Sequence, residues 1–109
     1  MTNKPAAILA MSLLCLPFSP GAQAQGAGQE ALYARSLAAT CANCHGTNGK
    51  AVEGSSVPSL AGLDKNFIID QIKAFKTGAR PATVMHQISK GYSDAQIESL
   101  ASYFAAQKK

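Results

Sequence analysis

The sequence "CANCH", residues 41–45, places two cysteines two residues apart and a histidine directly after the second. Cysteine pairs with this spacing bind zinc, exchange a disulfide or attach a porphyrin. A structural zinc ion needs four tetrahedral ligands, which adjacent residues such as Cys44 and His45 cannot readily provide together. A thioredoxin-like redox pair belongs in a βαβ unit, whereas this chain shows no alternating strand pattern. The first two uses are therefore disfavoured.

The five-residue form C-x-x-C-H is the attachment signature of c-type haem, in which the histidine ligates iron. At the end of a helix, two such thiols can reach neighbouring positions on the porphyrin rim while the next residue turns its imidazole toward the iron. We therefore predict one covalent haem c, bound through Cys41 and Cys44, with His45 as an iron ligand. An unligated cysteine pair or a disulfide is the remaining alternative.

The first 24 residues have the features of a secretory signal peptide. Lys4 supplies a positive start, residues 6–16 are apolar, and residues 22–24 read A-Q-A, an A-x-A cleavage pattern. The apolar run is shorter than the roughly 20 residues that a membrane-spanning helix needs. We expect cleavage after Ala24, which also removes Cys15, and no stable membrane insertion of the mature protein.

Residues 25–109 then form one small monohaem domain, which we expect in the periplasm. Apolar burial alone gives a domain of this size only marginal stability, so a covalent haem supplies a centre around which helices can pack. The formal net charge of the whole chain is +4, to which Lys4 contributes one. This charge is too small to indicate nucleic-acid binding, and it fits docking to an acidic protein surface.

The mature sequence predicts an all-α domain with three to four helices and one long loop. Residues 46–64 contain several glycines and a proline without helical or strand periodicity, and a loop of this length is expected to cover a cofactor edge. The predicted helical segments cover residues 29–40, 66–77 and 82–90, and a last helix begins at a Ser93–Gln96 capping box.

The other ring nitrogen of His45 needs a hydrogen-bond acceptor, and a backbone carbonyl in the following loop is a common choice. Pro58, in "VPSL" (residues 57–60), has a fixed φ that stiffens the loop. We expect its carbonyl to accept from His45, and the alternative is a proline that only forms a turn.

The second axial position of the iron is filled in an electron carrier and open in a protein that binds a gas or a substrate. After the leader, Met85 is the only methionine. At helical spacing Met85 and Ile88 share one side, whereas His86 aligns with Lys90 on what we expect to be the solvent side. We predict Met85 as the ligand, because a thioether raises the reduction potential of haem. Ligation by His86 and an open position are the alternatives.

The sequences "LAATCANCHGTNG", "PSLAG" and "FKTGARPATVMHQISKGYSDAQIESLASYFAAQ" together resemble the class I cytochromes c. The greatest similarity is to the haem domains of the cytochrome subunit of flavocytochrome c sulfide dehydrogenase, and it covers nearly all of residues 30–107. The resemblance implies a small class I cytochrome c fold around one covalent haem. It also implies thioether links at Cys41 and Cys44, His45 as proximal ligand and Met85 as distal ligand.

The same resemblance implies that the first helix packs across the last one near Tyr103 and Phe104. One departure from the family pattern is that the sulfide dehydrogenase subunit has two haem domains, whereas this chain has one C-x-x-C-H motif. The chain is thus expected to be either a one-haem version of that subunit or a free carrier of similar sequence.

The expected function is that of a periplasmic one-electron carrier, not an enzyme, that accepts electrons in sulfide or sulfur oxidation or in a respiratory chain. An obligate cytochrome subunit of a flavoprotein sulfide dehydrogenase is the first alternative, and a haem sensor or peroxidase with an open distal site is the second. Its partners are expected to be redox proteins. Five basic residues could steer an acidic partner or could serve only solubility: Lys65, Lys73, Lys76, Arg80 and Lys90.

Overall fold

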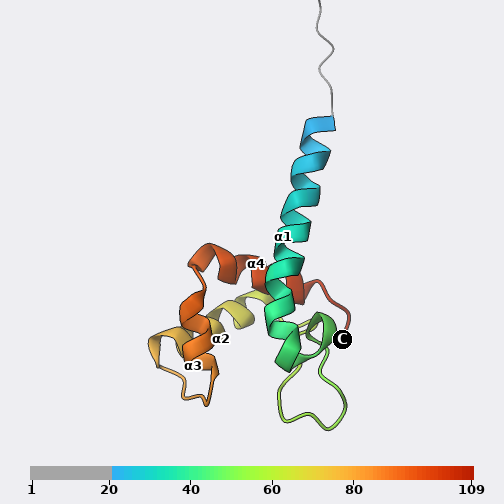
Figure 1. Cartoon of the computed structure of the whole chain (residues 1–109). Helices are drawn as coiled ribbons and strands as arrows, with labels where there is room; N and C mark the ends of the chain where they lie inside the picture. Colours follow the sequence, from blue (N-terminus) through green and yellow to red (C-terminus); the bar gives the residue numbers. More distant parts are fainter. Residues whose placement is uncertain (1–20) are drawn as a thin grey trace, which may run out of the picture.

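The computed structural model describes residues 21–109, and in this part of the chain all regular secondary structure is helical (Figure 1). The expected signal peptide lies, up to residue 20, outside the described residues. The predicted all-α class is confirmed. The elements are α1 (Gly21–His45), the 3₁₀ turn η1 (Thr47–Gly49), α2 (Lys65–Thr77), α3 (Met85–Ile88), the 3₁₀ turn η2 (Ser89–Gly91) and α4 (Asp94–Ala105).

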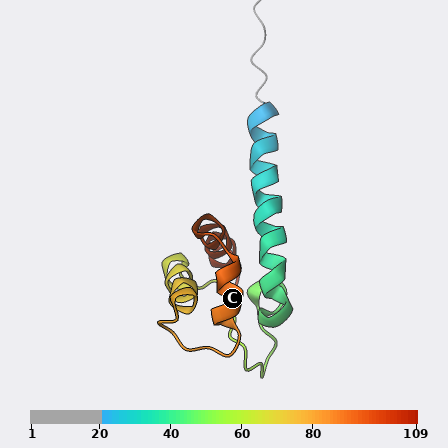
Figure 2. The same cartoon turned by 60° about the vertical axis from the view of Figure 1, so that its left-hand side comes forward.

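Helix α1 is longer than the sequence indicates. It begins at Gly21 rather than near residue 29, and it continues through the cysteines to His45. The side chains of residues 25–33 are exposed, and this end of the helix extends clear of the other helices in both views (Figures 1 and 2). Alanine and glutamine, which dominate here, favour the helix enough to offset the glycines. The part of α1 before Glu30 therefore forms a helix that projects from the packed domain (Figures 1 and 2).

Helix α2 has recognisable signals at both ends. The Asp64 side chain accepts a hydrogen bond of 2.9 Å from the backbone N–H of Phe67, which caps the first turn. Gly78 ends the helix in the left-handed conformation, with φ of 81°. Ile68 and Ile69 are buried on the inner face. These bounds differ from the predicted range by one residue.

Helix α4 is the centre of the packing. It begins at the predicted capping box, because Ser93 and Gln96 each bond the other's backbone N–H. Both α1 and α2 pack against it, and α2 also packs against α3. Figure 2 views α4 nearly along its axis, with α2 and α1 on either side. The buried apolar cluster contains Ala38, Ile68, Ile69, Ile97, Leu100, Ala101 and Phe104. The implied packing of the first helix on the last is thus present.

Hydrogen bonds join the loop after α1 to Gly49, at its own start, and to the last turns of α4. Gly49 accepts backbone hydrogen bonds from Leu60 at 2.7 Å and from Ala61 at 3.1 Å, and the N–H of Gly62 bonds the carbonyl of Phe104 at 2.9 Å. The hydroxyl of Tyr103 donates to the side-chain oxygen of Asn48 at 2.8 Å. These bonds fix residues 46–62 as a structured turn over the α1–α4 crossing.

Gly49→Ala should be strongly destabilising. The residue has φ of 78°, and an added Cβ would lie 2.6 Å from Cδ1 of the buried Phe104 ring. Left-handed backbone and overpacking together are expected to lower the free energy of unfolding by about 2–4 kcal/mol. Urea unfolding of the purified protein measures this loss.

Gly54→Ala is the matched control for this substitution. Gly54 has the same φ of 78°, but nothing lies within 4 Å of an added Cβ. Its expected cost is only about 1–2 kcal/mol. Equal losses in the two variants would contradict the packing role assigned to Gly49.

Candidate functional site

The last turn of α1 presents the two cysteines and the histidine together. Cys41 is half-buried, Cys44 is exposed, and the two thiols are free rather than joined in a disulfide. His45 is buried, with 8% of its surface exposed. Gly46 ends the helix directly after it with φ of 84°, where an added Cβ would overlap the carbonyl of Lys50. The helix end therefore fixes the position of all three side chains.

The imidazole of His45 makes a hydrogen bond to the loop. Its Nδ1 lies 2.7 Å from the carbonyl oxygen of Pro58, the contact that the sequence predicts for this pair. Because a carbonyl can only accept, Nδ1 carries the proton and Nε2 keeps its lone pair. This is the arrangement found in metal-binding histidines, whose other nitrogen donates to an acceptor that orients the ring. The donor set thus fits an iron porphyrin.

The surroundings of Cys41 disfavour a thiolate. Burial raises the pKa of the Cys41 thiol, the hydroxyls of Thr40 and Tyr92 partly oppose this effect, and the neighbouring Cys44 adds to it. A metal ion requires the deprotonated sulfur, whereas a thioether carries no charge. Within residues 21–109, moreover, no group of three or more His, Cys, Asp or Glu side chains is arranged to hold a metal ion. The raised pKa of the Cys41 thiol favours attachment as a thioether over ligation of zinc.

Met85 lies on a different element from His45. It is the first residue of α3 and is half-buried. Helix α3 packs against α2 and η2, whereas α1 packs against α4 and η1, and α1 and α3 are not among the closely packed pairs of the described chain. The two predicted axial ligands therefore come from elements that do not pack closely on each other. A flat group bound between them requires such a separation.

The position of His86 differs from the expectation. It is half-buried rather than on the solvent side, and its Nδ1 is enclosed without a hydrogen-bond partner. The one-turn helix α3 passes directly into η2, so the helical spacing that aligned His86 with Lys90 does not continue. Ligation through Nε2 would leave a buried N–H at Nδ1 unpaired, at a cost of about 1–3 kcal/mol. His86 is thus a poorer ligand than His45.

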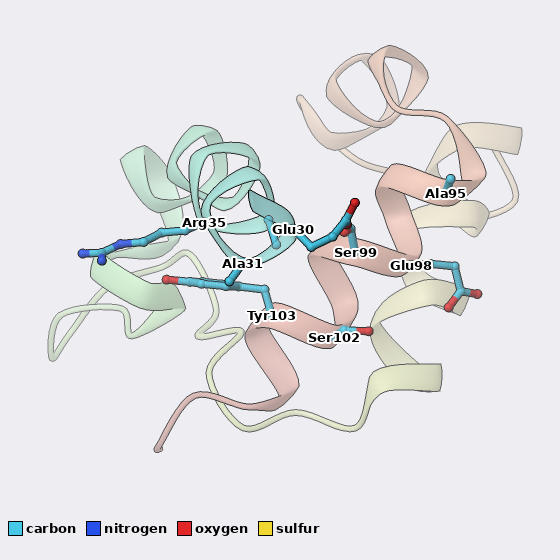
Figure 3. A pocket seen from close by; sticks show the side chains of 9 residues that line it. Glu30, Ala31, Arg35, Ala95, Glu98, Ser99, Ser102 and Tyr103 are labelled. Atoms are coloured by element: carbon cyan, nitrogen blue, oxygen red, sulfur yellow. The ribbon is translucent and has the colours of Figure 1, made fainter. Parts of the chain in front are cut away.

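An open hollow of the described surface lies away from these residues. It is an open groove of about 660 Å³ between residues 30–35 of α1 and residues 95–103 of α4 (Figure 3). A smaller hollow of about 260 Å³ lies beside Lys50 and Lys109. Neither is lined by the cysteines, His45, Pro58 or Met85. The candidate site is therefore identified by its donor groups, and these two hollows are separate from it.

The basic residues that could steer a partner are not a continuous ring. Lys65 pairs with Glu98 at 3.0 Å. Lys76 donates to the carbonyl of Tyr92 at 2.6 Å and also lies 3.7 Å from Asp94. These two lysines bind other parts of their own chain, a structural role that was not expected from the sequence.

Sequence reasoning missed a contact beside the cysteines. The hydroxyl oxygens of Thr40 and Tyr92 lie 2.6 Å apart although the residues are 52 positions apart in the chain. Nothing in the spacing of the two residues indicates that they meet, so the sequence contains no signal for this contact. It becomes visible only when α1 and the segment before α4 are placed side by side.

A helical fold with C-x-x-C-H at the end of its first helix, and with the histidine oriented by a loop carbonyl, defines a c-type cytochrome. The chain belongs to the cytochrome c family. Residues 24–104 match the family described as "Cytochrome C oxidase, cbb3-type, subunit III". Members of the family are electron-transfer proteins, and membership implies a covalently bound haem c.

Similar proteins include several cytochromes with roles in sulfur oxidation. A cytochrome subunit of sulfide dehydrogenase from Chlorobaculum tepidum is 40% identical over 68 residues, which are 62% of this chain and 60% of that protein. A thiosulfate dehydrogenase electron acceptor from Thiomonas intermedia is 39% identical over 71 residues, 65% of this chain and 33% of the relative. Cytochrome c4 of Pseudomonas aeruginosa is 32% identical over 93% of this chain and 48% of its own length.

A solved structure shows the same fold. Cytochrome c4 of Acidithiobacillus ferrooxidans superposes with a TM-score of 0.57 at 36% identity, over 61% of this chain and 37% of that one. This chain thus spans between a third and three-fifths of these proteins. The class I cytochrome c fold predicted from the sequence is confirmed. In the described part of the chain, no helix is sufficiently long and apolar to cross a membrane.

The bond between His45 and Pro58 should protect one imidazole proton from exchange with solvent. In the reduced protein we expect a slowly exchanging Nδ1–H resonance from His45, because the donor is buried and bonded at 2.7 Å. NMR of protein labelled with ¹⁵N-histidine detects it. The chain has two histidines, so a His86→Asn variant assigns the signal. Rapid exchange at His45 would contradict the proposed orientation of the ring.

Proposed function

We propose that this chain is an exported one-electron carrier whose haem c is bound through Cys41 and Cys44 and ligated by His45 and Met85. The observation that carries this proposal is the hydrogen bond of 2.7 Å between His45 Nδ1 and the Pro58 carbonyl, which leaves Nε2 available for iron. Family membership supplies the cofactor class, and the residue assignments rest on the geometry of this chain.

The residues of the chain would orient and tune the bound group. When bound, haem c supplies a couple that gains and loses one electron at the iron. The Pro58 carbonyl, by accepting from Nδ1, raises the basicity of His45 and fixes its ring. The thioether of Met85 is a neutral, polarisable donor that favours the ferrous state. The protein carries out no bond-making step.

Met85 is preferred over His86 as the second axial ligand for a specific reason. A histidine that ligates iron needs an acceptor at its other nitrogen, and the enclosed Nδ1 of His86 has none. A thioether carries no proton and has no such requirement.

The proposed location is the periplasm, after cleavage of the leader following Ala24. The A-x-A pattern at residues 22–24 and the short apolar run support it. The N-terminal sequence of the exported protein is expected to begin at Gln25. A protein that retains the apolar run and stays with the membrane would contradict this assignment.

The proposed partner is an enzyme that oxidises a reduced sulfur compound. Two similar proteins bear names that place them in such reactions, one as an electron acceptor of thiosulfate dehydrogenase and one as a subunit of sulfide dehydrogenase. The alternative is that the chain is an obligate subunit of a flavoprotein sulfide dehydrogenase. Co-purification with a flavoprotein at a fixed ratio would favour the subunit, whereas a free cytochrome reduced by several donors would favour the carrier.

Met85→Ala should remove the second iron ligand. The ferric wild-type protein is expected to show the weak long-wavelength absorption band of sulfur-ligated haem, and the variant should lose it and lower the reduction potential. His86→Ala should retain both properties. Absorption spectra and redox titration make the measurement. Retention of the band in Met85→Ala would overturn the Met85 assignment. Rapid carbon monoxide binding by the reduced wild-type protein, unaffected by Met85→Ala, would favour an open distal site.

A further inference from the structure

Two hydroxyl groups connect α1 with the segment that carries Met85. Thr40 Oγ1 lies 2.7 Å from the carbonyl of Leu37 and 2.6 Å from the hydroxyl of Tyr92. The carbonyl can only accept, so Thr40 donates its proton to Leu37. The Tyr92 hydroxyl must then donate to Thr40. Both groups thus have defined roles in one short chain of hydrogen bonds.

This contact is special because of the elements that it joins. Among the hydrogen bonds of residues 21–109, it alone links α1 to residues 79–92. Helix α1 packs closely against α4 and η1, and not against α3 or η2. The position of the segment relative to α1 therefore depends on this bond and on indirect packing through α2 and α4.

Tyr92 is also held from its other side. Its carbonyl accepts a hydrogen bond of 2.6 Å from Lys76 of α2, and its N–H bonds the carbonyl of Ser89 at 3.3 Å. Ser89, which is fully buried, ends α3 and begins η2. Only η2 and the single turn of α3 separate Tyr92 from Met85, so a displacement of the Tyr92 ring is expected to move the start of α3.

The two ends of the contact adjoin the two sides of the proposed site. Thr40 immediately precedes Cys41, and its hydroxyl lies 3.9 Å from the Cys41 sulfur. Tyr92 follows Met85 by seven residues, through α3 and η2. We propose that Thr40 and Tyr92 are positioning residues that hold the Met85 segment at a fixed separation from α1 and so keep the thioether on the iron. This inference rests on the proposed function.

The other two tyrosines provide matched controls. The Tyr33 hydroxyl accepts from Gln96 Nε2 at 3.0 Å, and the Tyr103 hydroxyl donates to Asn48 at 2.8 Å. Each bond ties the first part of the domain to α4, and neither involves residues 79–92. Removing these hydroxyls should affect general stability without a specific effect on Met85.

The test is the affinity of imidazole for the ferric holoprotein, because imidazole must displace the methionine to bind. Tyr92→Phe and Thr40→Val should each bind imidazole about two- to tenfold more tightly than wild type, as expected for the loss of one hydrogen bond. The double variant should show the same increase and not the product of the two. Tyr33→Phe, Tyr103→Phe and Thr40→Ser should match wild type.

The outcomes separate this inference from the function on which it rests. Wild-type affinity in Tyr92→Phe, or equal increases in the Tyr92→Phe and Tyr33→Phe variants, would overturn the positioning role and leave the iron ligands unchanged. A wild-type protein that lacks the sulfur-to-iron absorption band would overturn the proposed ligation and this inference with it. The band also confirms that each variant binds haem and is folded.

Discussion

The hydrogen bond between His45 and Pro58 is the constraint on which the proposed site depends. It connects the end of α1 to the loop that follows this helix. The loop is in turn bonded to Gly49 and to the end of α4, so the imidazole is oriented by a closed set of backbone contacts. Ring orientation is thus a property of the fold, and burial of His45 follows from the same contacts.

The packing around α4 explains how so small a domain can keep apart the two elements that carry the proposed ligands. Both α1 and α2 contact α4, while α3 reaches the core through α2. Within residues 21–109, the buried apolar cluster contains seven residues, three of them on α1 and α2. A domain with so few buried side chains gains much from a large apolar cofactor, because covalent attachment keeps that surface permanently in place.

Features with a local cause could be predicted from the sequence, and features with a remote cause could not. The motif at residues 41–45, the capping box at Ser93 and the end of α2 follow from neighbouring residues. The half-buried position of His86 could not be foreseen, since it depends on the change from α3 to η2. The contact of Thr40 with Tyr92 joins residues far apart in the chain. The 68 residues matched in the Chlorobaculum cytochrome subunit of sulfide dehydrogenase are 62% of this chain and 60% of that protein. The two chains therefore have nearly the same length.

The exposed N-terminal end of α1 offers a place at which other groups can be attached to the protein. Cleavage after Ala24 would place a positive α-amino group at the start of a helix, where the dipole disfavours it, and the first turn should fray. Because residues 25–33 are exposed, such fraying costs the domain nothing elsewhere. An affinity tag, a fluorophore or a surface linker placed at this end would therefore leave the redox centre undisturbed and accessible.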